Sequence, residues 1–406
     1  MWTRRSGASH DMQGVLDLFV PPIAVWSDIS AILGAWSQSP RFLQPSTPPL
    51  SLVLHEIGWG ELVRCLRILP RPLESLTCRA PVHPSALFPL NEHSGVLLSR
   101  FSLRRLDMTG ALTFESSSPS FNYIQSLRLR ELRGNICPNL FFEGLRGSPS
   151  LRELELAGPT QPPTTSYVVA VREPAPRLFD CLERVIFAGD GTWSRLLEWI
   201  DAPKLKYLDL SVSSLDVCGA LLHAWHRLSR ATSPLPTPPL VELRLNRCGI
   251  GADGRSLCSL VNQLPFLQRL EITGCGDDVN PAILTLAGNC KSGIIVGDEC
   301  PPLPCPRLQY VDFSRCSQVR GTSIRDLVKS RLPPRSPDNT KSETALDNPS
   351  VSGSLPLQAV IIDQCPNVPA ELLPWLRQHV SRVSCAYETK VQAKERMPRT
   401  SRYNGP

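Results

Sequence analysis

A nine-position pattern that recurs in the second half of the chain constrains its fold more than any other feature. Apolar residues fill the first, fourth and sixth positions, and cysteine fills the ninth. Alternating apolar residues in a short segment indicate a β-strand with one buried face. Their recurrence predicts parallel strands stacked along one sheet. The four copies are Leu240, Leu243, Leu245 and Cys248; Leu267, Leu270, Ile272 and Cys275; Leu308, Val311, Phe313 and Cys316; and Leu357, Val360, Ile362 and Cys365.

Further copies of the apolar triplet precede these four and lack the ninth-position cysteine. Together they give about ten or eleven units, so most of the chain is expected to form one repeat array. A weaker copy is Leu73, Leu76 and Cys78, and Leu52 to Leu54 is predicted to be a further strand. The clear copies are Leu103, Leu106 and Met108; Ile124, Leu127 and Leu129; Leu151, Leu154 and Leu156; Leu182, Val185 and Phe187; and Leu205, Leu208 and Leu210.

The spacing of these residues resembles the leucine-rich repeat, in its cysteine-containing, ribonuclease-inhibitor-like subtype. The resemblance implies an α/β fold, a leucine-rich-repeat solenoid. Such a fold has a curved parallel sheet on the concave side and helices and loops on the convex side. Residues 254–264 and 323–332 are predicted to be two of the helices that return the chain to the next strand.

The ninth-position cysteines have a structural interpretation. We expect them in the turn that leaves each strand, where a small side chain with a weak S–H donor can reach a neighbouring carbonyl. They should therefore be buried and reduced. Cys300 and Cys305 flank a proline run, but Cys290 and Cys316 lie too far away to complete a zinc-ribbon spacing. The sequence predicts no metal site and no cofactor.

Proline-rich stretches make the spacing of the units uneven. Successive cysteine-containing triplets start 27, 41 and 49 residues apart, and proline accounts for 40 of the 406 residues. Long insertions in surface turns are thermodynamically tolerable. We predict a helical N-terminal flank over 1–48, a repeat array over 49–385 and a disordered tail over 386–406. The insertions predicted to be disordered are 158–176, 229–239, 291–306 and 333–356.

Charge and hydropathy restrict the environment of the chain. Lysine and arginine total 43 against 37 acidic residues, a mild net charge of +6 that identifies no partner. No apolar run approaches the ~20 residues that a membrane span needs, and the first residues lack a signal-peptide core. With 14 cysteines and no Asn-x-Ser/Thr acceptor, the chain is expected to be intracellular, either cytoplasmic or nuclear, with no membrane partner.

Two groups of segments carry a further resemblance. Residues 267–275 and 287–290 are close to the repeats of F-box receptors, and residues 25–29, 35–39 and 49–54 are similar to the region that follows the F-box in mushroom-type fungal F-box proteins. The resemblance implies a substrate receptor of a cullin-type ubiquitin ligase, with the cullin linker subunit as a further partner if an F-box lies upstream. The residues before Trp26 lack the Leu-Pro-x-Glu opening of an F-box, so the F-box itself is expected to be absent.

Two motifs that could indicate chemistry also have structural interpretations. Residues 249–254 match G-x-G-x-x-G after a strand, with Glu271 about 20 residues further on. A dinucleotide-binding strand should be continuously apolar, whereas residues 241–247 alternate, so a nucleotide-binding enzyme is a remote alternative. His223 and His226 lie on a predicted helix without the other residues of a zinc site and are interpreted as a surface pair. We predict no catalytic residue and no enzyme activity.

The residues between the apolar positions are expected to line the concave face. The third, fifth and seventh positions of nine triplets hold eight acidic and six basic residues, which is unlike a nucleic-acid-binding surface. This mixture predicts protein–protein recognition, by a ligase receptor or by an adaptor or inhibitor without a ligase link; solvated strand residues are the structural alternative. The predicted partner-binding residues are Tyr207, Asp209, Arg244, Arg269, Glu271, Tyr310 and Asp312.

Overall fold

The structure is a computed structural model, and it forms two compact units. The first comprises residues 1–212 and 223–238, and the second comprises residues 213–222 and 239–406. The described residues are 15–19, 50–55, 59–68, 73–79, 88–90, 98, 101–114 without 102, 121–133 without 122, 138–158, 177–189, 196–231, 238–288 without 252, 303–332 and 354–386.

The first unit contains a parallel sheet. Its strands follow one another in the order β1-β2-β3-β5-β6-β7-β9-β11, with β4 beside β5. Helices α2 (Trp59–Ile68) and α4 (Pro138–Gly144) lie in connections between strands, and the short strands β8 (Arg177–Leu178) and β10 (Ile200–Asp201) form a separate pair. The strands of the sheet are β1 (Val15–Phe19), β2 (Leu50–His55), β3 (Leu73–Arg79), β4 (Phe88–Leu90), β5 (Arg105–Phe114), β6 (Ser126–Arg133), β7 (Glu153–Ala157), β9 (Arg184–Ala188) and β11 (Tyr207–Asp216).

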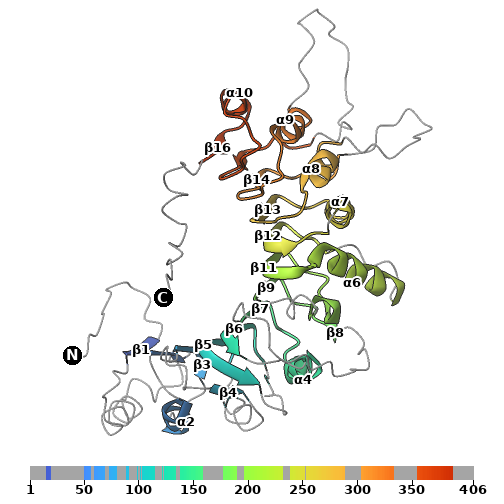
Figure 1. The fold of residues 1–406 in the computed structure, drawn as a ribbon. Helices are drawn as coiled ribbons and strands as arrows, with labels where there is room; N and C mark the ends of the chain where they lie inside the picture. Colours follow the sequence, from blue (N-terminus) through green and yellow to red (C-terminus); the bar gives the residue numbers. More distant parts are fainter. Residues whose placement is uncertain are drawn as a thin grey trace, which may run out of the picture. The chain divides into compact units, whose positions relative to one another are not determined.

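The second unit alternates strands and helices more regularly. Its parallel strands β12 to β16 are neighbours in chain order. Figure 1 shows α7, α8 and α9 in a row beside strands β12, β13 and β14. The strands are β12 (Glu242–Gly249), β13 (Arg269–Thr273), β14 (Tyr310–Asp312), β15 (Ala359–Ile361) and β16 (Arg382–Ser384). The helices are α7 (Arg255–Asn262), α8 (Asn280–Leu286), α9 (Gly321–Lys329) and α10 (Leu372–His379), and α6 (Val217–Ala231) follows β11.

The apolar triplets form the core of both units, as the sequence pattern predicts. Every residue of the triplets is buried, from Leu52 and Leu54 through Leu357, Val360 and Ile362. Helices α7 and α9 lie within or close to the predicted ranges 254–264 and 323–332, and they bury residues such as Leu260 and Leu327 against the strands. The α/β class and the parallel sheet are therefore confirmed.

The ninth-position cysteines make the expected turn. The residue before each of them has a positive φ, which turns the chain. Strands β13, β14 and β15 end before this residue, whereas β12 continues to Gly249. The Sγ atoms of three of them donate to the carbonyl oxygen of the sixth-position residue in the preceding repeat, and that of Cys248 donates to the Asn246 carbonyl oxygen of its own strand at 3.5 Å. Burial raises the pKa of Cys365 to about 11, so its thiol stays a protonated donor. The bonds run from Cys275 to Leu245 at 4.0 Å, from Cys316 to Ile272 at 3.1 Å and from Cys365 to Phe313 at 3.0 Å.

Some predicted boundaries need correction. Within the flank expected to be helical, the structure describes only Val15–Phe19, and this segment is strand β1 because its residues pair in parallel with β2. Residues 229–231 end helix α6 rather than beginning a disordered insertion. Leu355 donates its backbone N–H to the Pro306 carbonyl at 2.8 Å, so the ends of two predicted insertions are ordered against each other. The remainder of these segments, and residues 25–49 with their F-box-like motifs, lie outside the described residues.

A buried arginine ties three connections of the second unit together. The Arg331 side chain is 1% exposed, and its guanidinium donates to the carbonyl oxygens of Leu286, Pro304 and Cys305 at 3.2, 2.8 and 3.0 Å. Burial lowers its pKa. No helix in the described part of the chain is long and apolar enough to cross a membrane.

Candidate functional site: the exposed face of the sheet

In each nine-position repeat, the side chains at the third, fifth and seventh positions lie on the face of the sheet opposite the buried triplet. They alternate with the buried triplets, so strands β7, β9 and β13 each show half-buried side chains between fully buried ones. We call this surface the exposed face. Because the strands within each compact unit are parallel and in register, its third-position residues form one row across the strands and its fifth-position residues form another.

In the first unit, two arginines of β6 bridge the carboxylates of both neighbouring strands. Arg128 lies 2.9 Å from Glu153, and Arg130 lies 2.5 Å from Glu155 and 3.4 Å from Asp107. Burial works against ionisation of Glu153, but hydrogen bonds from Ser126 and Arg128 outweigh it and lower the pKa of that carboxyl. Opposite charges therefore hold these strands in one register.

In the second unit, two glutamates and two arginines alternate in sign along and across the neighbouring strands β12 and β13. Glu242 lies opposite Arg269 across the strands, and Arg244 lies opposite Glu271. The Arg244 guanidinium is 2.6 Å from Glu242 and 3.3 Å from Glu271. Arg269 is 3.2 Å from Glu242 and also pairs with Glu271 along its own strand. Each arginine is thus shared between two carboxylates.

The third-position row reads Glu, Arg, Tyr across three successive strands in each unit. In the first unit these residues are Glu153, Arg184 and Tyr207, and in the second they are Glu242, Arg269 and Tyr310. The arginine pairs with the glutamate at 3.2 Å in both rows. It also stacks on the tyrosine, with Cζ 3.7 Å from the Tyr207 ring centroid and 3.9 Å from that of Tyr310. We call these two sets the Glu–Arg–Tyr rows.

An aspartate and a serine follow the tyrosine on its own strand in both units. Asp209 accepts hydrogen bonds from Tyr207 Oη at 3.1 Å and Ser211 Oγ at 3.3 Å. Asp312 accepts from the backbone N–H and Oγ of Ser314 at 2.8 and 2.6 Å. We call each pair an Asp–Ser corner. Burial raises the pKa of the Tyr310 hydroxyl, so it stays neutral beside its corner.

The structure places all seven predicted recognition residues on the exposed face. Arg244, Arg269, Glu271, Tyr310 and Asp312 lie together in the second unit through the contacts above. Tyr207 and Asp209 lie in the first unit, beside Arg184. The prediction omitted Glu153, Arg184 and Glu242 as partners of these residues. Aligning the third positions of successive triplets would have found them, because both alignments read Glu, Arg, Tyr.

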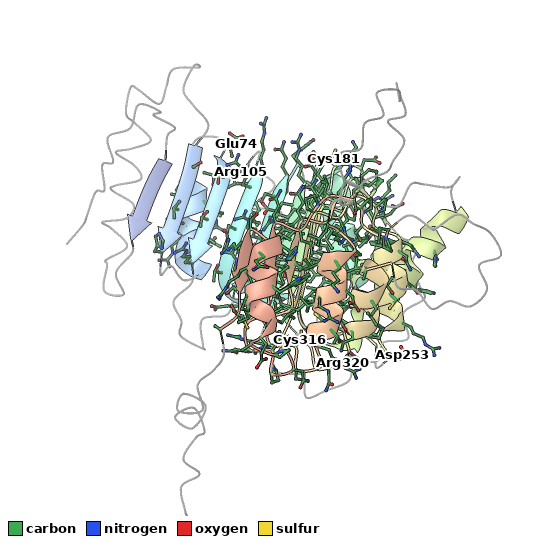
Figure 2. The ribbon with its side chains drawn as sticks, turned by 90° about the horizontal axis from the view of Figure 1, so that it is seen from above. Glu74, Arg105, Cys181, Asp253, Cys316 and Arg320 are labelled. Atoms are coloured by element: carbon green, nitrogen blue, oxygen red, sulfur yellow. The ribbon has the colours of Figure 1, made fainter. Side chains whose placement is uncertain are left out.

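The G-x-G-x-x-G turn is packed against the next turn of the second unit. Gly251 and Gly254 have φ values of 85° and 66°, which favour glycine. A Cβ at Gly254 would lie 2.6 Å from the Asp278 carbonyl oxygen and 3.5 Å from the Pro281 ring. Backbone conformation and close packing therefore account for Gly251 and Gly254 without a bound phosphate. Figure 2 shows Asp253, in this turn, along the same edge of the unit as Cys316 and Arg320.

The remaining candidate residues for chemistry lie apart from the exposed face. His223 and His226 are both exposed on α6. Cys305 is buried and donates its S–H to the Val261 carbonyl at 3.1 Å, and burial raises its pKa to about 12, which disfavours the thiolate that a zinc ion needs. Cys290 and Cys300 lie outside the described residues. No protein-family model matches the chain, and no curated protein matches its sequence.

Proposed function

We propose that this chain is a leucine-rich-repeat protein that binds a partner protein through the exposed face of its sheet. The repeat assignment is supported by the burial of every nine-position triplet and by the ladder of cysteine turns. The observation that carries the binding proposal is the presence of a Glu–Arg–Tyr row in each unit. Tyrosine and arginine, held on rigid strands, are the residues that most often contribute strongly to protein interfaces.

The charge pairing favours a protein partner over nucleic acid. Arg128, Arg130, Arg184, Arg244 and Arg269 all have a carboxylate within 4.0 Å. A phosphate would have to displace these carboxylates and would meet their repulsion. A protein surface with charges of both signs can match the pattern without breaking the pairs.

The finer proposal is a substrate receptor of a cullin-type ubiquitin ligase. It is supported by the likeness of short segments within 25–29, 35–39, 49–54, 267–275 and 287–290 to F-box proteins. An adaptor or inhibitor without a ligase link would use the same face, so the two differ in their second partner. Co-purification of a cullin linker subunit with the full chain from its own cells favours the receptor, and its absence from otherwise intact partner complexes favours the adaptor.

The binding proposal can be tested by capturing partners from cells with matched variants. One variant combines Tyr207→Ala with Tyr310→Ala, and another combines Arg244→Glu with Arg269→Glu. The control reverses Arg325 and Arg377, which are exposed on α9 and α10. Truncating central interface residues typically costs about 2 kcal/mol or more, so the two face variants should lose their partners while the control keeps them. Unchanged partners in all folded variants would contradict the proposal.

A further inference from the structure

A repeated turn at one edge of the second unit carries exposed apolar and basic side chains. Residues 264–267 and 305–308 each form a turn in which the N–H of the fourth residue donates to the carbonyl oxygen of the first, at 3.2 and 3.0 Å. Proline is the second residue of both turns, where its fixed φ suits the turn. Phe266 and Arg307 are the third residues of these turns. They therefore lie side by side at the edge of the sheet where β13 and β14 begin.

These two side chains contact each other, and a third joins them from the next repeat. The Cζ atom of Arg307 lies 5.3 Å from the centroid of the Phe266 ring, a cation–π contact. Leu355 lies beside the second turn, because its backbone N–H donates to the Pro306 carbonyl oxygen at 2.8 Å. Phe266 is 39% exposed and Leu355 is 41% exposed, and Arg307 is exposed as well. We call Phe266, Arg307 and Leu355 the edge cluster.

Buried hydrogen bonds fix the turn that carries Arg307. The Cys305 thiol donates to the Val261 carbonyl oxygen at 3.1 Å, and the Arg331 guanidinium donates to the Cys305 carbonyl oxygen at 3.0 Å. Both Cys305 and Arg331 are buried. Because the turn is held from the core side, its exposed side chains lose little conformational entropy when a partner covers them.

The edge cluster differs from the same turn in the first unit. The third residue of the equivalent turns there is Ser150, Cys181 or Lys204. Single apolar side chains on a surface are ordinary, whereas clusters of them mark interaction sites. In the part of the chain that the structure describes, no carboxylate lies within 4.0 Å of the Arg307 guanidinium. A guanidinium over an aromatic ring still presents N–H groups along its own edge, and their planar arrangement matches a carboxylate.

We propose that the edge cluster binds a segment of a partner protein in which an acidic side chain lies between two apolar ones. The carboxylate accepts paired hydrogen bonds from Arg307, and the apolar side chains cover Phe266 and Leu355. A basic side chain is repelled, and a wholly apolar segment leaves the covered guanidinium without a counter-charge. The proposal goes beyond the proposed function, because the edge cluster lies outside the exposed face and wholly within the second unit.

Short synthetic peptides, capped at both ends, provide the probe. Each carries one glutamate between two leucines, with zero to three glycine or serine residues on either side of the glutamate. One matched set replaces the glutamate by glutamine, and another replaces both leucines by serine. Binding to the full-length chain is measured by fluorescence anisotropy at low salt.

The variants test each member of the edge cluster. They are Arg307→Gln, Phe266→Ala and Leu355→Ala, and circular dichroism with urea denaturation checks that each is folded. Arg320→Gln is the matched control, because it removes one exposed positive charge from the opposite edge of the second unit. Arg320 follows β14 whereas Arg307 precedes it, and Figure 2 shows Arg320 along the same edge as Asp253.

We expect a glutamate peptide of at least one spacing to bind the wild type about tenfold more tightly than its glutamine and serine counterparts. Arg307→Gln should weaken the binding of this peptide about tenfold and remove its advantage over the glutamine peptide. Phe266→Ala and Leu355→Ala should weaken the glutamate and glutamine peptides alike, because they remove apolar contacts. The control should bind like the wild type.

Three outcomes would overturn the proposal. One is that no glutamate peptide binds the wild type, or that the glutamine peptides bind it equally well. Another is an equal loss of binding with Arg307→Gln and Arg320→Gln, which would show an effect of net charge alone. The third is binding that appears only after Asp298→Asn and Glu299→Gln are introduced, because the chain's own acidic segment would then occupy the edge cluster.

Discussion

The two units present similar exposed faces on differently terminated strands. In the first unit, β5 runs for ten residues and β6 for eight, and the ninth position of the β6 repeat is Leu132, inside the strand. In the second unit, β14 and β15 have three residues each and a cysteine turn follows, whereas β12 has eight residues and contains its ninth-position Cys248. Both units nevertheless carry a Glu–Arg–Tyr row and an Asp–Ser corner.

The comparison separates two roles that lie within one repeat. The buried triplet recurs in both units, whereas the ninth position is cysteine only in the four copies of the second unit. The exposed positions do not depend on that cysteine, since Glu, Arg and Tyr recur at the third positions of repeats with and without it. We infer that the cysteines are structural, whereas the rows and corners are candidates for function. Variants in each class sharpen or break this separation.

The largest effect should come from the buried triplets. Leu243 and Leu154 occupy the same position in the two units, and both are fully buried. Replacing either by alanine should lower the free energy of unfolding by about 2–5 kcal/mol, because the lost contacts leave a cavity. Urea denaturation of each variant measures the loss. A change below about 1 kcal/mol at either site would contradict the equivalence of the two cores.

The cysteine turn should contribute less to the stability of the fold than a core leucine does. Cys316 is fully buried and its Sγ lies 3.1 Å from the Ile272 carbonyl oxygen. Cys316→Ala should destabilise the protein by about 1–2 kcal/mol through the lost contact and the small cavity. Cys385→Ala, at a half-exposed cysteine outside the ninth positions, is the control. Equal melting temperatures for the two variants would argue against a structural role of the turn.

The ion pairs of the first unit should make a smaller contribution to the free energy of unfolding, and this contribution should depend on pH. The folded pKa of Glu153 lies below its ordinary value of 4.5, so its stabilisation is present above that pH and is lost as the pH falls through the folded pKa. We expect Glu153→Gln to cost less than about 1 kcal/mol at neutral pH, since the pairs are partly solvated.

Chemical denaturation of wild type and Glu153→Gln between neutral pH and pH 3 measures this contribution. The difference in unfolding free energy should shrink below pH 4.5. Glu183→Gln, which removes an exposed pair with Lys206, provides the baseline. A difference that stays constant with pH would mean that ionised Glu153 does not stabilise the fold.

The smallest effects on stability are expected at the corners. Asp209→Asn and Asp312→Asn keep the size of the side chain and an oxygen atom that can accept the hydrogen bonds of the corner. The free energy of unfolding should change by less than about 0.5 kcal/mol, because both side chains are only partly buried. A loss as large as that of Cys316→Ala would show that the corners stabilise the fold and would undermine their assignment to recognition.

The periodicity of the apolar residues predicts the core well and the connections poorly. Alternation identifies which residues face inward, and all the triplets are buried because a half-buried strand has little freedom in this respect. The buried position of Arg331 could not be predicted from this alternation, because it depends on contacts between connections that are distant in sequence. It follows α9 in sequence, but the carbonyl oxygens of Leu286, Pro304 and Cys305 that hold it come from distant segments.

The candidate site could be predicted only in part, because it also depends on contacts between segments that are distant in sequence. Individual exposed-face residues such as Tyr310 follow from the alternation within one strand. Their pairing with residues such as Arg269 depends on the register between strands, which insertions of different length hide in the sequence. The Asp–Ser corners required the hydrogen bonds themselves, because aspartate and serine are common in strand-leaving turns.

Site-specific photocrosslinking tests the central claim, recognition by the exposed face, most directly. A photoreactive phenylalanine analogue can replace Tyr207 or Tyr310 on the exposed face, and Ser259 or Arg325 on the exposed sides of α7 and α9. After irradiation in cells, we expect the analogue at Tyr207 and Tyr310 to form covalent adducts with the same partner protein, and the helix positions to form none with it. Adducts of that partner only at Ser259 or Arg325 would place recognition on the helices and contradict the claim.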